Sequence, residues 1–189
     1  VYTNVSHPGL EGDLDLMRRL KELVPSGARG LDAGCGAGAR DVFYYWRDGY
    51  DIVGFDAIPE NIQVARDLHP EIADRVSVAD LSLPLDYPDI SFDFVLCNAV
   101  IQHIPPDKAL SVTLPELARV LKPGGVLQLM FKIGEGIKTV YDKDYQDQRT
   151  FQLYSPDQVL SVLRDHALHL VPPDGDNLGG VIYFTDPKP

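Results

Sequence analysis

The 189-residue sequence predicts an α/β fold in which helices cover a mostly parallel sheet. Short apolar segments, typical of buried strands, alternate along the chain with segments of helical periodicity. Two aspartates mark the ends of these strand candidates: Asp56 directly follows one, and Asp80 is the last residue of another. A glycine-rich stretch, 34-GCGAG-38, separates the first strand from the next helix. In open α/β sheets, ligands bind at this edge, outside the carboxyl ends of the strands.

The amino-terminal half supplies three helices and three strands. The helix predicted over 14–23 repeats leucine and methionine at helical spacing and stops before a proline. The helix over 39–47 follows the glycines and ends at a glycine, and the helix over 58–68 has a proline at an early, tolerated position. Short apolar runs between the helices predict strands. These strands cover residues 28–33, 52–55 and 76–80.

The alternation continues to residue 131. A strand over 92–98 precedes a helix over 107–121, whose first aspartate can cap it. A Lys-Pro-Gly-Gly turn at 122–125 then leads into a strand over 126–131. Each of these elements extends the same strand-helix alternation.

The last part of the chain departs from the alternation. Residues 133–151 are polar and rich in tyrosine, and they lack clear periodicity. Ser155 can cap a helix over 156–166 that has proline at its first position. Strand candidates over 168–171 and 181–185 follow without a helix between them, which predicts an antiparallel terminal pair.

Composition narrows the classes of function. The formal net charge of −11 disfavours nucleic acid as a partner, because such binding needs Lys and Arg to neutralise phosphates. No apolar run reaches the roughly 20 residues of a membrane span, and no signal peptide is visible. Cys35 and Cys97 suggest neither a disulfide framework nor a zinc site. We therefore expect a cytoplasmic protein with no membrane partner and no metal; the sequence does not indicate an oligomeric state.

The glycine spacing indicates a nucleotide-type ligand. Gly34, Gly36 and Gly38 allow positive φ and a close approach of the backbone to a ligand. A dinucleotide fingerprint places its third glycine one position later, where Ala39 is tolerated. The glycines alone therefore leave open a nicotinamide site, another nucleoside site and a tight turn without a ligand.

The aspartates favour an adenosine. Asp56 follows the second strand about 20 positions beyond the glycines, where a carboxylate can accept hydrogen bonds from both ribose hydroxyls. Asp80 can accept a bond from an adenine amino group, and the backbone N–H of Leu81 can reach a ring nitrogen. Ile58 can cover the adenine face. The alternatives are a helix cap at Asp56, a solvated Asp80 and a core isoleucine.

Five segments together carry a family resemblance. In chain order they read DAGCGAG, FDAI, VADL, FDFVLCNAVIQHIPP and LARVLKPGGVLQL. This set resembles the class I S-adenosylmethionine-dependent methyltransferases of the small-molecule type (methyltransferase-11/25-like), from about residue 14 to the end. The resemblance implies a Rossmann-like three-layer sandwich. Its seven-stranded sheet would have the order 3-2-1-4-5-7-6, with strand 7 antiparallel.

The resemblance also implies a cofactor, S-adenosylmethionine, with S-adenosylhomocysteine as product. It places the methionine moiety over the glycines, with Asp32 at its amino end, the ribose on Asp56 and the adenine near Ile58, Asp80 and Leu81. The expected cofactor-binding residues are Asp32, Gly34, Cys35, Gly36, Gly38, Asp56, Ala57, Ile58, Asp80, Leu81 and Asn98.

Methyl transfer is an in-line displacement, so catalysis is expected to come mainly from proximity and orientation. Asn98 stands where amino-group methylases begin an Asn/Asp-Pro-Pro-aromatic motif, but Ala99 follows it here. This departure favours a small-molecule acceptor. His103 is the candidate catalytic base where the acceptor has a proton to lose; the alternative is a histidine packed at a strand-to-helix corner.

The expected organisation is one methyltransferase domain over 1–189. Its parts are an N-terminal lid and helix (1–27), a cofactor-binding core (28–132), a possible acceptor-pocket insertion (133–155) and a last helix with a terminal β-pair (156–189). Tyr141, Tyr145 and Tyr154 in the insertion are candidate substrate-binding residues; the alternative is a surface loop anchored by aromatics. Two other functions stay open: an NAD-dependent oxidoreductase on a similar sheet, and a non-catalytic S-adenosylmethionine-binding domain.

Overall fold

The computed structural model of the chain describes residues 11–143, 146–171 and 180–185. Its main sheet has six strands in the order β3-β2-β1-β4-β5-β8, and every neighbouring pair is parallel. A separate antiparallel pair consists of β6 and β7. The strands are β1 (Arg29–Ala33), β2 (Asp51–Asp56), β3 (Val76–Val78), β4 (Phe92–Asn98), β5 (Leu121–Phe131), β6 (Ile137–Asp142), β7 (Asp147–Gln152) and β8 (Gly180–Thr185).

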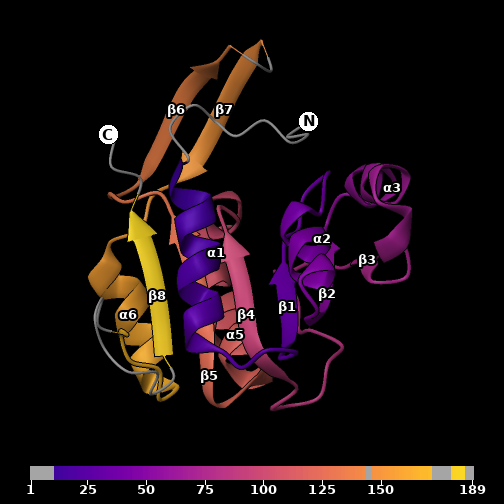
Figure 1. Cartoon of the computed structure of the whole chain (residues 1–189). Helices are drawn as coiled ribbons and strands as arrows, with labels where there is room; N and C mark the ends of the chain where they lie inside the picture. The colour runs from indigo at the N-terminus through magenta and orange to yellow at the C-terminus, as the bar shows by residue number, and fades with distance from the viewer. Residues whose placement is uncertain (1–10, 144–145, 172–179, 186–189) are drawn as a thin grey trace.

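Helices cover both faces of the main sheet (Figure 1). One face packs against α1, α2 and α3, and the other against α5 and α6. The helices are α1 (Glu11–Leu23), α2 (Arg40–Arg47), α3 (Pro59–Leu68), α4 (Pro106–Lys108), α5 (Leu114–Val120) and α6 (Pro156–Asp165), with 3-10 turns η1 (Pro70–Ile72) and η2 (Ile101–His103) and a π-helical turn η3 (Ala109–Thr113). The predicted three-layer α/β architecture is confirmed.

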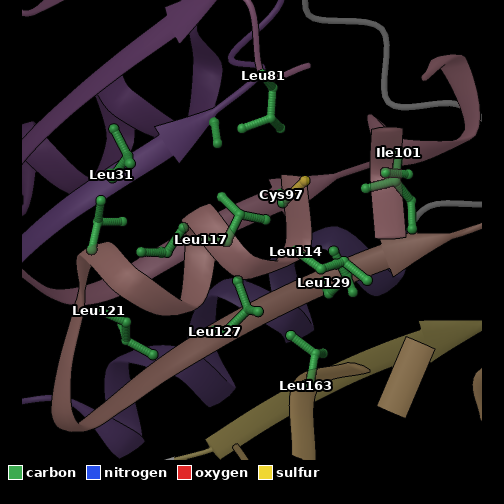
Figure 2. Close-up of a cluster of buried hydrophobic side chains, with 14 of the residues drawn as sticks. Leu31, Leu81, Cys97, Ile101, Leu114, Leu117, Leu121, Leu127, Leu129 and Leu163 are labelled. Atoms are coloured by element: carbon green, nitrogen blue, oxygen red, sulfur yellow. The ribbon is translucent and has the colours of Figure 1, made fainter. Parts of the chain in front are cut away.

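The two cores follow from the alternation of side chains along buried strands. In β4, Phe94 and Leu96 face the α1–α3 side, whereas Val95 and Cys97 face the α5–α6 side. Because both faces are covered, these strands are apolar throughout rather than alternating with polar residues. Figure 2 shows the second core, with leucines from β1, β5, α5 and α6 pointing into it.

The prediction for the end of the sheet was wrong in its count and direction. The first five positions have the predicted order, but in the described residues the sheet has six strands, and β8 lies parallel to β5 rather than antiparallel. Residues 168–171 contain an isolated bridge instead of a strand, so the described residues contain no terminal antiparallel pair. Helix α6 lies between β5 and β8 in the chain, and such a helical crossover joins parallel neighbours.

A hairpin lies largely within residues 133–151, where the sequence shows no clear periodicity. Strands β6 and β7 pair antiparallel from Ile137↔Gln152 to Asp142↔Asp147. Figure 1 shows this hairpin beyond the carboxyl ends of the sheet strands. It lies within the predicted insertion, next to the edge where the glycine-rich turn is found.

Candidate functional site

The glycine loop between β1 and α2 is fixed by backbone conformation. Gly34 has φ 94° and Gly36 has φ 67°, which are left-handed values that favour glycine. The backbone N–H groups of Gly34 and Cys35 donate to the carbonyl oxygen of Phe55, at 2.8 and 2.9 Å. These bonds hold the loop at the end of β2, next to Asp56, the residue predicted to bind the ribose.

Asp56 joins that loop to the next helix. One carboxylate oxygen accepts from the backbone N–H of Gly36 at 3.0 Å. The other accepts from the backbone N–H of Ile58 at 2.9 Å and from the Asn61 side chain at 3.0 Å. The two oxygens of a carboxylate offer about four acceptor positions, so these three bonds leave capacity for a ligand. Ala57 is exposed, and Ile58 is 52% exposed beside the carboxylate.

Asp32, near the end of β1, is a buried carboxylate at 4% exposure. Within the described part of the chain no side chain or backbone group donates a hydrogen bond to it. Burial and the neighbouring carboxylate of Asp41 raise the pKa of Asp32 well above its usual value, against the lowering effect of Arg40. A buried carboxylate without a donor is costly, and a cationic ligand group would relieve that cost.

Asn98, at the end of β4, belongs to a chain of polar side chains. Its amide nitrogen donates to Asp41 at 3.3 Å, and its oxygen accepts from Gln128 at 3.1 Å. Asp41 also accepts from the Arg40 guanidinium at 3.0 Å. Both ends of the Asn98 side chain are thus engaged, and it orients the carboxylate that faces Asp32.

Sequence reasoning missed Asp41 and Gln128. Asp41 lies in the first turn of α2, and Gln128 interrupts an otherwise apolar stretch of β5. A polar residue within this apolar stretch was the signal available in the sequence, and the structure shows that the Gln128 side chain is 2% exposed. Its side-chain oxygen is fully buried and has no hydrogen-bond partner in the described residues.

Asp80 and Leu81 follow β3, as predicted. The Asp80 carboxylate is exposed and accepts from the backbone N–H and hydroxyl of Ser82, at 2.8 and 2.7 Å. The Leu81 side chain is buried, and its carbonyl oxygen accepts from the Thr113 hydroxyl at 2.8 Å. These bonds fix the loop that would border an adenine.

The two cysteines are poor nucleophiles. Burial raises the pKa of both Cys35 and Cys97 far above the thiol's usual value. In the described ranges, no three His, Cys, Asp or Glu side chains gather as a metal site. No helix in those ranges is long and apolar enough to cross a bilayer.

The turn after β4 packs against the glycine loop. A Cβ atom placed on Gly34 would lie 2.4 Å from a methyl carbon of Val100. The 3-10 turn η2 follows and ends at His103, whose ring centroid lies 5.3 Å from that of Phe151 in β7. The His103 side chain is exposed to solvent. Its pKa is nevertheless lowered, mainly by partial burial of the ring and to a smaller extent by the cations Arg149 and Lys132. The imidazole is therefore neutral at pH 7.

The predicted substrate tyrosines differ in position. Tyr141 in β6 is 63% exposed. Tyr154 is 1% exposed, and its hydroxyl lies 3.1 Å from the carbonyl oxygen of Ile101 and 3.0 Å from that of Ile104. It therefore braces the turn that contains His103. Tyr145 lies outside the described residues, as do residues 1–10 of the predicted N-terminal lid and helix (1–27).

A pocket of about 420 Å³ lies at the base of the hairpin. It is lined by Pro106, Gly134, Glu135, Gly136, Gln152, Leu153, Tyr154, Ser155 and Gln158. Apart from Tyr154, none of the predicted cofactor or substrate residues lines it, so it is separate from the glycine-loop site.

Comparison with known proteins gives the family. A methyltransferase domain is matched over residues 31–129. The chain is 35% identical over 106 residues to the 2-methyl-6-phytyl-1,4-hydroquinone methyltransferase of Synechocystis sp., covering 56% of this chain and 32% of that protein. It is 32% identical over 164 residues to phosphoethanolamine N-methyltransferase 2 of Caenorhabditis elegans, covering 84% of this chain and 36% of that protein. The chain thus spans about a third of the length of these two relatives.

A solved structure shares the fold. The crystal structure of a SAM-dependent methyltransferase from Methanosarcina mazei superposes with a TM-score of 0.63 at 22% identity, covering 76% of this chain and 81% of that one. The domain match covers the glycine loop, Asp56, Asp80 and Asn98 together. The chain therefore belongs to the class I S-adenosylmethionine-dependent methyltransferases, and its cofactor is S-adenosylmethionine.

Proposed function

We propose that the chain transfers a methyl group from S-adenosylmethionine to a small-molecule acceptor by in-line displacement. When bound, the cofactor supplies an electrophilic methyl group on a sulfonium sulfur. The observation that carries the proposal is Asp32, a buried carboxylate without a described donor beside the glycine loop. A ligand with ammonium and sulfonium charges suits this point, because it would stabilise the ionised form of the buried carboxylate. The names of the two curated relatives, which act on a hydroquinone and on phosphoethanolamine, support a small acceptor.

The roles of the other residues follow from their contacts. Asp56 would accept from the ribose hydroxyls, while Ile58 and the loop at Asp80 and Leu81 would border the adenine. Asn98 would hold Asp41 toward the methionine end. Catalysis would come mainly from alignment of acceptor, methyl and sulfur, which can lower a barrier by several kcal/mol, up to about 7–11 kcal/mol in well-oriented intramolecular models.

Calorimetric titration with S-adenosylmethionine, S-adenosylhomocysteine and NAD tests the cofactor assignment. We expect micromolar binding of the first two and no binding of NAD. Asp56→Ala should weaken binding by at least about 100-fold, because it removes the charged acceptor of the ribose hydroxyls and the three bonds that join the glycine loop to α3. Asp74→Ala removes an exposed aspartate and is the matched control. Binding of NAD instead would identify an oxidoreductase. Binding of both methionine derivatives without turnover over a broad acceptor panel would identify a non-catalytic domain.

His103 is the proposed proton acceptor where the acceptor atom must lose a proton. Its neutral imidazole at pH 7 is in the required form, although the neighbouring cations weaken it as a base. The variant His103→Asn should then lower kcat by about 10²-fold or more and remove the acidic limb of the pH profile. Normal turnover with an unchanged pH profile would exclude this role.

A further inference from the structure

Three basic side chains from three segments converge on one aromatic ring. Phe151 in β7 is 5% exposed. The Lys132 ammonium lies 4.9 Å from the centroid of its ring, and the guanidinium carbon of Arg149 lies 5.0 Å from the same centroid. The His103 ring centroid is 5.3 Å away. We call these four residues the Phe151 cluster.

The charge of this cluster is opposite to that of the chain as a whole. The chain carries a formal net charge of −11, yet among the described residues the charged groups that act on the His103 imidazole are the cations Arg149 and Lys132. Partial burial and these two cations hold the pKa of His103 below its usual value. The two cations add a positive contribution to the potential at the imidazole, which favours an anion.

The cluster stands next to the methyl-transfer site. His103 ends the turn η2, and the preceding Val100 packs against the glycine loop at Gly34. Lys132 directly follows β5, and its backbone N–H donates to the Gln102 side chain at 3.1 Å. Both segments are at the carboxyl edge of the sheet, where Figure 1 shows the hairpin. A group bound here would lie on the acceptor side of the glycine loop.

The hairpin aims the basic side chains toward this edge. Arg149 and Phe151 are two positions apart in β7, so their side chains lie on the same face of the hairpin. The contact between Phe151 and His103 shows that this face looks toward η2. Contact with the Phe151 ring restricts the side chains of Lys132 and Arg149 in the free protein. These side chains therefore lose less conformational entropy when a ligand binds.

We propose that the Phe151 cluster is an anion subsite for the methyl acceptor, which would carry a phosphate or carboxylate group held by Lys132 and Arg149 with His103 as a further donor. Guanidinium binds either oxyanion through two parallel hydrogen bonds, and the ammonium adds a point charge. The bound anion would also offset the two cations beside His103 and make its imidazole a better base. The inference rests on the proposed methyl-transfer function for the identity of the ligand as an acceptor.

The test titrates protein saturated with S-adenosylhomocysteine with inorganic phosphate and, in parallel, with acetate at constant ionic strength. The readout is the NMR signal of the His103 imidazole, identified by its loss in His103→Gln. We expect a saturable shift with a millimolar dissociation constant. Binding of phosphate alone would indicate a phosphorylated acceptor, and equal binding of acetate would indicate a carboxylate.

Matched variants separate the subsite from general charge effects. Lys132→Met and Arg149→Met should each weaken anion binding by about tenfold or more, while Lys143→Met, which removes an exposed cation from the same hairpin, should leave it unchanged. Retained affinity for S-adenosylhomocysteine shows that each variant is folded.

Two results would overturn the inference: no saturable shift with either anion, or an equal loss in Lys143→Met. Failure of the proposed function looks different. In that case S-adenosylhomocysteine does not bind, and an anion that still binds the cluster cannot be assigned as part of an acceptor.

Discussion

The glycine loop and the β6–β7 hairpin meet at the same edge of the sheet, but different interactions hold them. The loop depends on backbone φ values, two hydrogen bonds to Phe55 and the contact of Gly34 with Val100. The hairpin is held by its own ladder and by a few side chains such as Phe151. Its apolar residues Ile137 and Tyr141 are 65% and 63% exposed.

The two regions should therefore differ in how well they tolerate amino-acid substitutions. A loop fixed by backbone geometry admits few substitutions, because a side chain strains its left-handed φ values. An exposed hairpin can change side chains at little cost to stability. In the proposed function, the fold would keep the methyl donor in one place and would allow the proposed acceptor-facing hairpin to vary.

The largest expected effect is that of Gly34→Ala. The alanine must adopt φ 94°, and its Cβ would lie 2.4 Å from a methyl carbon of Val100. Backbone strain and overpacking together should lower the free energy of unfolding by about 2–5 kcal/mol. Denaturant unfolding measures this loss.

Gly36→Ala is the matched control, since its φ is 67° but no atom lies within 4 Å of the added Cβ. It should cost only about 1–2 kcal/mol. Adding Val100→Ala to Gly34→Ala should recover part of the stability. Equal costs for the two alanine variants would mean that the Val100 contact does not restrict the loop.

The next effect concerns the buried charge in the cofactor region. Asp32→Asn should weaken S-adenosylmethionine binding by about 10–100-fold, because it removes the charged partner of the ammonium group. The raised pKa of Asp32 has the opposite consequence for the free protein. The unfolded chain loses this proton more readily, so the wild type loses stability as the pH rises above 3.8 toward the folded pKa.

Asp32→Asn should therefore gain stability relative to the wild type over that pH range while it loses cofactor affinity. Thermal unfolding between pH 3 and pH 8 measures the first effect and calorimetry the second. A variant that loses both stability and binding would show that Asp32 is structural rather than a ligand group.

The regions also differ in what the sequence could predict. Parallel strands covered on both faces read as apolar runs, and the predicted cap at Ser155 is confirmed by its bond from the Gln158 backbone N–H at 3.2 Å. The hairpin strands, IKTVYD and DQRTFQ, are largely solvent-exposed and carry no such pattern. The link from Gln128 through Asn98 to Asp41 joins three elements, so no sequence spacing indicates it.

A third prediction compares proton linkage in the two regions. Binding a cation beside Asp32 favours its ionised form, so the cofactor should bind more tightly as the pH rises toward the raised pKa of the free protein, with release of a proton. An anion at the Phe151 cluster favours the imidazolium form of His103. Its pKa starts below 6.5, so anion binding should take up a proton and weaken as the pH rises.

Calorimetry in buffers of different ionisation enthalpy counts both protons, with sulfate as the anion because it does not titrate in this range. Each affinity should change by at most about tenfold per pH unit. Asp32→Asn should abolish the proton release on cofactor binding, and His103→Gln should abolish the proton uptake on anion binding. Proton release in both binding reactions, or proton uptake in both, would contradict the proposal that Asp32 binds a cation and the Phe151 cluster an anion.

The smallest expected effect separates the two tyrosines of the acceptor side. Tyr154→Phe removes the hydroxyl that lies beside the buried carbonyl groups of Ile101 and Ile104. The Ile101 carbonyl keeps its bond from the Ile104 backbone N–H, so the loss should cost about 0.5–1.5 kcal/mol of stability. Tyr141→Phe removes a hydroxyl from an exposed side chain and should change stability by less than about 0.5 kcal/mol. Because Tyr154 also braces the turn at His103, its loss should broaden the His103 NMR signal, and Tyr141→Phe should not. Equal costs would mean that the Tyr154 hydroxyl does not support this turn.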